Sequence, residues 1–346
     1  MIRRRTLLLK ATLGGVGLGV GGTAGASEVV RHELNHVSAD ERAAADVDEW
    51  QHIAWDYGQT YRVTAPATLM QALTVDLQGL QLAIDRQPDK TAQRQLRQAS
   101  ALLATFTALT AGNLGKLIEA RRWWRTARRV ADQAGDPYTV LWVRGREVAR
   151  AGYEHRPVSD ILQLADEAEA RLDAAPPEAQ PELLAGKAQT LALAGRPVDA
   201  EQALCQVREC FGKLTPASRR DSTFDWGEEN LRYTESFVYS HLGDFAKADQ
   251  AQNAALRLYP DTAVRGPAKI ELLRALCLTR SGDLTHGTRH AQTIITDLPV
   301  AHHVRPVADL GQKVLNAIPA HERRQSWAQE YRECVESSFL PGQPTQ

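Results

Sequence analysis

Cysteine is scarce in this chain and is not arranged for pairing. The 346 residues include four cysteines, and no CxxC pair occurs. Cys205 and Cys210 lie five residues apart in a segment with helical spacing, so their side chains project in different directions. This excludes a disulfide-stapled secreted domain and predicts free thiols, which favours a reducing compartment.

An excess of charge and long hydrophobic runs are also missing. The formal net charge is −1 at pH 7, so nothing attracts the whole chain to nucleic acid. The apolar stretch near the N-terminus is interrupted by many glycines, which makes it a poor membrane-spanning helix. We therefore expect no direct DNA binding and no stable membrane span.

Signatures of common catalytic and cofactor sites are missing as well. The sequence has no Gly-rich phosphate loop, no G-x-S-x-G motif and no nucleophile placed beside a base. We expect a non-catalytic protein that needs neither a cofactor nor a metal ion.

One short motif argues against that expectation. His32-Glu33-x-x-His36 matches the signature of zinc metallopeptidases, in which both histidines bind zinc and the glutamate deprotonates its water. A peptidase also needs a sheet beside this helix and a third ligand, and only a Gly-rich stretch precedes the motif. A surface helix is the favoured interpretation, and a zinc metallopeptidase is a remote alternative.

The rest of the sequence predicts helices nearly throughout. Apolar residues recur at spacings of three and four, and no segment alternates as a strand does. Proline and glycine mark the breaks between the helices. Such breaks are predicted at 87–90, 134–137, 175–181 and 265–267.

Spacing around glycines repeats along the chain. In 242–260 a Gly-Asp turn is followed by alanines five and twelve residues after the glycine, and by proline seventeen residues after it. Related patterns follow Gly115, Gly195 and Gly282, and a weaker copy turns at Ala151-Gly152. Glycine permits the turn of a helix hairpin, and small residues seven apart let its two helices approach closely. The sequence thus predicts an all-α fold, an α-solenoid of degenerate helix-hairpin repeats.

The segment 242–260 resembles the tetratricopeptide (TPR) consensus in particular. Together, "VDEWQHIAWDYGQTY" (47–61) and "AGDPYTVLWVRGREVARAGYEHRP" (134–157) resemble the C-terminal TPR region of actinobacterial helix-turn-helix regulators of the XRE type. The resemblance covers about residues 45–320. In that family a DNA-reading domain precedes an RR-x-L-L connector, whereas this chain begins at the connector. The resemblance implies peptide sensing and a transcription-linked role, without DNA binding by this chain.

The first 27 residues have two interpretations. Arg4-Arg5-Thr6-Leu7-Leu8 resembles a twin-arginine export signal, and Ala24-Gly25-Ala26 resembles a cleavage site. The same stretch also fits the connector of the regulator family, which favours a cytoplasmic protein. Export with cleavage after Ala26, giving an extracytoplasmic repeat scaffold, remains the alternative. We divide the chain into a leader or connector (1–27), N-terminal helices (28–90), TPR-like repeats (91–320), and a C-terminal helix and tail (321–346).

The predicted ligand site is the concave groove formed by the first helix of each repeat. Counting back from the turn glycines places five side chains there, namely Trp142, Arg146, Gln189, Asn230 and Tyr233. Arginine and asparagine can bind a peptide backbone or carboxylate, and the aromatic rings can stack on side chains. Some of them can instead pack between repeats, Trp142 above all. The long insertion 213–230 is predicted to cover one end of the groove.

Other side chains have structural interpretations. Trp124 belongs to a packing stripe and is predicted to be in the core, while Arg121, Arg125, Arg128 and Arg129 form a strip that we expect to pair with acidic residues such as 166–170. His286 and His290 are expected on a solvated helix face. The favoured function is a repeat protein that binds a peptide or protein partner.

Overall fold

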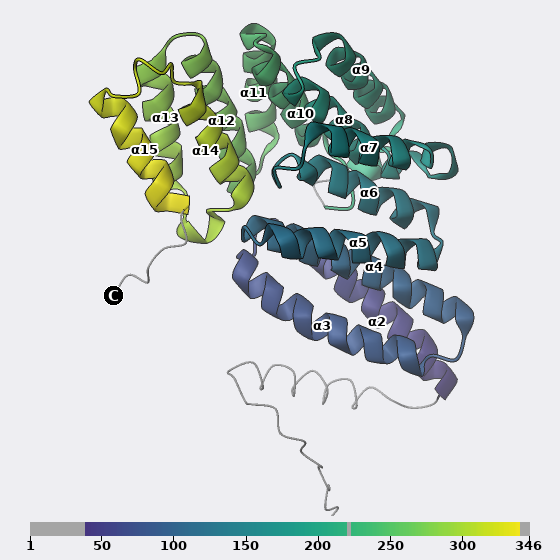
Figure 1. The fold of residues 1–346 in the computed structure, drawn as a ribbon. Coiled ribbons are helices and arrows are strands. Elements are labelled where there is room, and N and C mark those ends of the chain that lie inside the picture. Colours follow the sequence, from purple (N-terminus) through teal and green to yellow (C-terminus); the bar gives the residue numbers. More distant parts are fainter. Residues whose placement is uncertain (1–38, 220–222, 340–346) are drawn as a thin grey trace, which may run out of the picture. The chain divides into compact units, whose positions relative to one another are not determined.

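A computed structural model describes residues 39–219 and 223–339 (Figure 1). The chain divides into two compact units, Met1–Arg42 and Ala43–Gln346. The helices of the described residues belong to the second unit, apart from the first turn of α2. The described residues contain helices and no strand, so the prediction of an all-α fold is confirmed.

Fourteen α-helices follow one another along the described part of the chain. They are α2 (Ala39–Thr60), α3 (Pro66–Arg86), α4 (Lys90–Asn113), α5 (Leu117–Ala134), α6 (Pro137–Ala151), α7 (Val158–Glu169), α8 (Pro181–Leu193), α9 (Pro197–Lys213), α10 (Glu228–Leu242), α11 (Phe245–Leu258), α12 (Arg265–Arg280), α13 (Leu284–Asp297), α14 (Arg305–Ala317) and α15 (Ser326–Phe339). Short 3₁₀ turns at Leu172–Ala174, Pro177–Ala179, Pro216–Arg219 and Val300–His302 connect some of them.

Four of the predicted turn glycines have the left-handed backbone that such turns require. The φ angles of Gly115, Gly195, Gly243 and Gly282 are +74°, +65°, +84° and +101°. A Cβ atom at any of them would meet nothing within 4 Å, so the backbone conformation and not the space requires glycine. The weaker repeat at Ala151-Gly152 has a different turn. Helix α6 ends at Ala151, and the residue with a left-handed backbone is His155 (φ 54°) and not Gly152.

The small residues of the repeat let the paired helices approach closely. Ala120, Ala200 and Ala248, each five residues after its glycine, are fully buried. At the equivalent Gly287, a Cβ atom would lie 2.4 Å from Thr279 Oγ1 and 2.9 Å from the backbone oxygen of Ala275. Helix α13 can therefore pack against α12 only because this position has no side chain.

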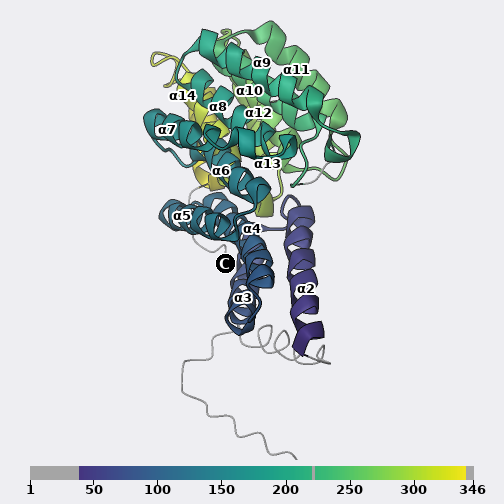
Figure 2. The ribbon, with the colours of Figure 1, turned by 90° about the vertical axis from the view of Figure 1, so that its right-hand side faces the viewer.

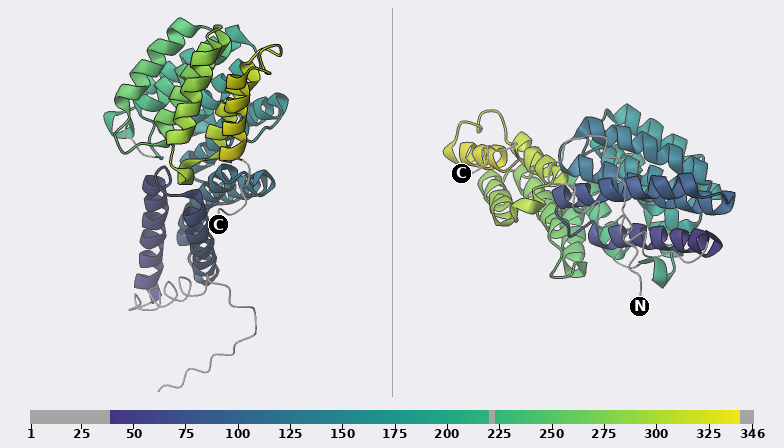
Figure 3. Two further views of the ribbon diagram at one scale, coloured as in Figure 1. Left: turned by 90° about the vertical axis from the view of Figure 1, so that its left-hand side faces the viewer. Right: turned by 90° about the horizontal axis from the view of Figure 1, so that it is seen from below.

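The helices pack as successive hairpins. The contacting pairs include α4 with α5, α8 with α9, α10 with α11, and α12 with α13. Figure 2 shows α10 beside α11, and the left view of Figure 3 shows the C-terminal helices α12 to α15 in green and yellow. Four hydrophobic clusters follow the chain in turn, as expected when each hairpin contacts mainly its neighbours. This architecture is compatible with an α-solenoid.

The first helices of the hairpins form an inner series of contacts. Helix α4 contacts α6, α6 contacts α8, and the series continues through α10 and α12 to α14. Helix α14 in turn contacts α4, so the series returns to its start. At this closure Arg265, which begins α12, donates from Nε to the backbone oxygen of Arg62 at 2.8 Å. A return of this kind encloses space that an open groove would leave to solvent.

Three further predictions concern side chains and the N-terminal motifs. Trp124 is fully buried and donates from Nε1 to Glu154 Oε1 at 2.6 Å, which confirms its place in the core. The four cysteines are free, as predicted. The twin-arginine-like leader and the His32-Glu33-x-x-His36 motif lie outside the described residues.

Candidate ligand-binding cavity

A cavity of about 240 Å³ lies among the inner helices of the second unit. Its walls come from α6, α8, α10 and α12, with contributions from the end of α2, the loop between α11 and α12, and the start of α14. Thr223 and Trp226, which belong to the insertion predicted to cover one end of the groove, also line it. The cavity holds about eight water volumes, which is enough for a small ligand or for the end of a longer one.

Four of the five predicted ligand-binding residues line this cavity. They are Arg146 on α6, Gln189 on α8, and Asn230 and Tyr233 on α10. They come together because the first helices of successive hairpins pack side by side and present equivalent faces. Counting back from the turn glycines thus selected residues on three helices that line one cavity, and their role in binding a ligand stays a prediction.

The fifth predicted residue, Trp142, does not reach the cavity wall. Its side chain is buried in the core, where its ring lies 6.0 Å from that of Phe106 and 5.4 Å from that of Phe224. The prediction of a ligand contact by Trp142 is therefore wrong. The reason is that Phe224, from the insertion before α10, packs onto the Trp142 ring and covers it. The two residues are 82 positions apart in the sequence, so counting helix positions back from a turn glycine could not reveal their contact.

Arg146 is held at the cavity by one carboxylate and one carbonyl. Its Nη1 lies 3.0 Å from Glu182 Oε1, and its Nη2 donates to the backbone oxygen of Thr223. Glu182 also accepts a hydrogen bond from Trp226 Nε1 at 3.1 Å. The Nε atom of Arg146 is buried and has no hydrogen-bond partner in the described part of the protein. This nitrogen has almost no accessible surface, and the guanidinium lies 5.2 Å from the centre of the Trp142 ring, so the cavity meets Arg146 mainly through its positive charge.

Arg150 and Arg265 surround a buried tyrosine instead of a carboxylate. Arg150 donates to the Tyr61 hydroxyl at 2.6 Å, and Asn113 donates to the same oxygen at 2.9 Å. Arg265 donates to the backbone oxygens of Tyr61 and Arg62, and its guanidinium lies 5.5 Å from the centre of the Tyr61 ring. Burial alone would raise the pKa of Tyr61, but the positive charges and these hydrogen bonds lower it from its usual value. Three arginines, Arg150, Arg265 and Arg146, thus place positive charge around this tyrosine at the cavity wall.

Lys269, one turn after Arg265 on α12, is the least compensated cation. Its Nζ lies 4.1 Å from the centre of the Tyr233 ring, and no carboxylate of the described residues pairs with it. Burial lowers the pKa of Lys269 to about 7, with further lowering from Arg150, Arg62 and Arg265. A lysine without a counter-ion among arginines lowers stability unless a ligand neutralises it.

The lining as a whole is cationic. Arg62, Arg146, Arg150, Arg265 and Lys269 face a single acidic lining residue, Glu182, which gives a formal balance of +4. A second carboxylate, Glu229, lies behind the wall, 3.9 Å from Arg62. Since the whole chain is almost neutral, this concentration of positive charge is a local property of the inner surface.

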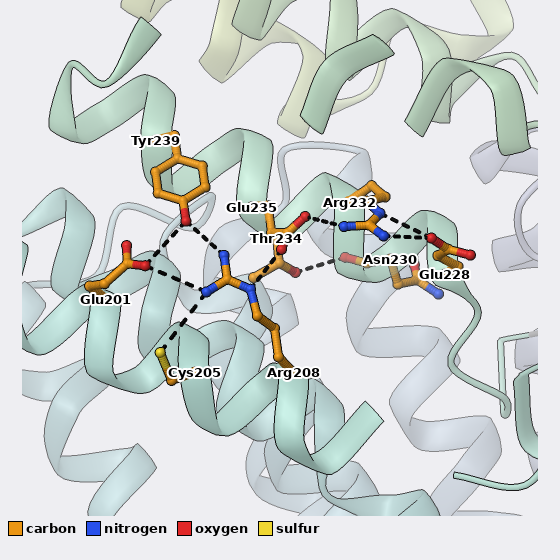
Figure 4. A network of polar contacts seen from close by, with 9 residues as sticks. All are labelled: Glu201, Cys205, Arg208, Glu228, Asn230, Arg232, Thr234, Glu235 and Tyr239. Carbon is orange, nitrogen blue, oxygen red and sulfur yellow. Dashed lines mark hydrogen bonds and ion pairs between the residues drawn. The ribbon is translucent and has the colours of Figure 1, made fainter. Parts of the chain in front are cut away.

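A polar network fixes the helix that presents Asn230 and Tyr233 (Figure 4). Glu235 on α10 bridges Arg208 of α9, at 2.8 Å, and Arg232, at 2.9 Å. Arg208 also donates to the Tyr239 hydroxyl at 2.7 Å. Glu235 is largely buried, so these bonds hold α10 against α9 and keep Asn230 at the cavity.

The predicted arginine strip lies in a separate, shallow depression on α5, α6 and α7. The depression measures about 810 Å³, is open to solvent, and is lined by Arg125, Arg128 and Arg129 among others. The expected partners were wrong: Arg128 pairs with Glu147 at 3.1 Å, whereas Asp166 and Glu169 pair with Lys187. The strip is thus partly neutralised, but by a buried carboxylate of α6 that the sequence did not indicate.

The histidine pair lies on an accessible helix face, as predicted. His290 Nε2 contacts Glu271 Oε2 at 2.8 Å, and His286 contacts Asp283 at 3.2 Å. Within 39–219 and 223–339, no three side chains of His, Cys, Asp or Glu are grouped as a metal site. None of the helices in the same ranges combines the length and hydrophobicity needed to cross a bilayer.

Four cavity cations were missed from the sequence, namely Arg62, Arg150, Arg265 and Lys269. A signal existed for some of them, because Arg146 with Arg150 and Arg265 with Lys269 are pairs four residues apart, which share a helix face. No local signal could place Arg62 beside Arg265.

Comparison of the chain with protein-family models and with curated proteins found no match in either case.

Proposed function

We propose that this chain is a non-catalytic helical-repeat protein of the TPR type that binds a peptide or protein partner through its inner cavity. The observation that carries the proposal is the meeting of Arg146, Gln189 and Asn230, from three successive first helices, at one cavity. Guanidinium and amide groups suit the backbone and the carboxylate of a peptide. The small volume means that the partner inserts an end or a side chain and does not lie extended in a groove.

A binding role agrees with the electrostatics of the lining better than a catalytic one. Its only carboxylate, Glu182, already bonds with Arg146 and Trp226, so it is poorly placed to exchange protons with a substrate. The regulatory part of the proposal comes from the resemblance to TPR-containing regulators. A ligand that contacts four successive first helices can shift their spacing, which would change the surface that a second protein meets.

Selection from a phage-displayed random peptide library on the immobilised full-length protein tests this proposal. Ala263→Trp serves as the blocked counter-target, because Ala263 lies at the cavity wall in the loop before α12, where a larger side chain fills space without disturbing a helix. We expect peptides that bind the wild type and lose binding to Ala263→Trp and to Asn230→Ala, with both variants folded by circular dichroism. Peptides that bind all three proteins equally would place the binding surface elsewhere.

A further inference from the structure

We propose that the group entering the cavity is a phosphate monoester, carried either by a small molecule or by a phosphorylated side chain. This inference rests on the proposed role of the cavity as the ligand site and names the chemistry that it selects.

The cations of the lining favour a ligand with more than one negative charge. Arg62 pairs with Glu229 and Arg146 with Glu182, which leaves Arg150, Arg265 and Lys269 without a carboxylate partner among the described residues. A peptide carboxylate, with one charge, leaves most of this excess in place. A phosphate monoester carries a charge of about −1.5 to −2 at neutral pH and offers three acceptor oxygens on one group. It compensates more of the buried charge in the same volume.

The free donors suit such a group. The Lys269 ammonium, with three N–H groups, makes no ion pair in the described part of the chain, and Arg150 donates to a tyrosine hydroxyl and not to a carboxylate. The N-terminus of the 16-residue helix α12 adds to them, since Val264, Arg265 and Gly266 line the cavity at its first turn. Arg265 and Gly266 carry backbone N–H groups at this turn, whereas Pro267 has none and the N–H of Ala268 bonds to Val264. The helix dipole still favours an anion here, and the side chains of Arg265 and Lys269 reinforce the effect.

The rest of the lining accommodates what the phosphate is attached to. Tyr61, Tyr233, Tyr259 and Trp226 present rings beside the cations. Arg265 already lies against the Tyr61 ring and Lys269 against the Tyr233 ring, so these rings give the cavity an apolar edge beside its cations that an organic substituent can contact. The cavity measures about 240 Å³ and is partly open to solvent, so it can hold a phosphate group while the rest of the ligand extends outward.

Isothermal titration calorimetry with the full-length protein tests the assignment. The buffer is free of phosphate, at pH 7.5 and low salt, and the probes are phenyl phosphate, phenyl sulfate and phenol. They share a ring and differ in charge. The variants are Lys269→Met and Arg150→Gln, and the matched control is Arg125→Gln, an exposed arginine of the outer depression. Circular dichroism verifies that each variant is folded.

We expect phenyl phosphate to bind at least about tenfold more tightly than phenyl sulfate, and phenol not to bind. Lys269→Met and Arg150→Gln should each weaken phenyl phosphate about tenfold or more, while Arg125→Gln changes it less than about twofold. Equal binding of sulfate and phosphate, or cavity variants that bind as the wild type does, would overturn the assignment.

A last comparison separates the two sources and the two proposals. A phosphotyrosine peptide that binds far more tightly than phenyl phosphate identifies a modified side chain as the source, and the reverse order identifies a small molecule. Both results support the phosphate assignment. If phenyl phosphate binds more tightly than the phosphotyrosine peptide, and the library selection also yields no binding peptide, only the proposal of a peptide partner is refuted. Library peptides that bind without phosphate, and that phenyl phosphate does not displace, refute the phosphate assignment alone.

Discussion

Replacing Lys269 by methionine should make the protein more stable and its cavity less able to bind an anion. The lysine lies among Arg150, Arg62 and Arg265, and no carboxylate of the described residues pairs with it. Methionine keeps a similar length, removes the charge, and places a thioether against the Tyr233 ring that the ammonium now faces. The change therefore removes an electrostatic cost with little change in packing.

The size of the effect follows from the pKa of Lys269. Its value falls from 10.5 to about 7 on folding, and each unit corresponds to about 1.36 kcal/mol, which gives an upper limit of about 5 kcal/mol. Solvent in the cavity screens part of this, so we expect a gain of about 2–4 kcal/mol in the free energy of unfolding at pH 6. Because the pKa is lowered in the folded state, the unfolded chain binds the proton more tightly. The destabilisation of the wild type by Lys269 is full below pH 7 and disappears as the pH rises toward 10.5. At pH 9.5 the Lys269→Met variant should therefore exceed the wild type by less than about 1.5 kcal/mol in the free energy of unfolding.

Urea unfolding followed by circular dichroism at pH 6 and pH 9.5 measures both values. Urea is preferred to guanidinium chloride, whose anion competes for the cavity. Lys247→Met is the matched control, since Lys247 lies 5.0 Å from the centre of the Tyr239 ring but is exposed and pairs with Asp244. It should not become more stable. A Lys269→Met variant that is less stable than the wild type at pH 6, or whose gain does not fall with pH, would refute the reasoning.

Four further outcomes are expected. Gly243→Ala should lower the free energy of unfolding by about 1 kcal/mol in urea titrations, because φ is +84° while a Cβ atom meets nothing, and Gly243→Asn should recover part of the loss. Gly287→Ala should cost about 1–3 kcal/mol by the same measurement, since its Cβ atom would lie 2.4 Å from Thr279 Oγ1; a cost below that of Gly243→Ala would contradict the close helix approach. Trp124→Phe should lower the free energy of unfolding by about 1–3 kcal/mol, because it leaves the buried Glu154 carboxylate without the indole donor at 2.6 Å. An unchanged midpoint of thermal unfolding would show that this hydrogen bond does not stabilise the fold.

The fourth outcome concerns pH and binding. Lys269 is faced by Arg150 from α6, Arg62 and Arg265, Glu182 from α8 and Tyr233 from α10, and a bound phosphate should restore its proton. Phenyl phosphate should thus bind roughly tenfold more weakly at pH 8.5 than at pH 7 in calorimetry, because the free lysine loses its proton above a pKa of about 7. The dependence should be absent in Lys269→Met, and its persistence there would assign it to another group.

The sequence by itself determined the helices, most of their turns, and four residues on three of the first helices that line the cavity. These features depend on interactions within a few residues: glycine permits the left-handed turn at Gly195 and Gly243, and small side chains seven apart set the approach of the next helix. The positions of Arg146, Gln189 and Asn230 at the cavity followed from that local periodicity.

Only the tertiary structure decided which side chains meet across long separations. Phe224 covers Trp142 and withdraws it from the ligand site, and Arg265 bonds to Arg62 across 203 positions. The contact of α14 with α4 belongs to the same class. Such contacts depend on the summed rotation from one hairpin to the next, and repeats of 37 to 48 residues make that rotation irregular. For this reason the sequence predicted a concave groove, whereas the folded chain has a cavity, partly open to solvent, that is lined by five cations and one carboxylate.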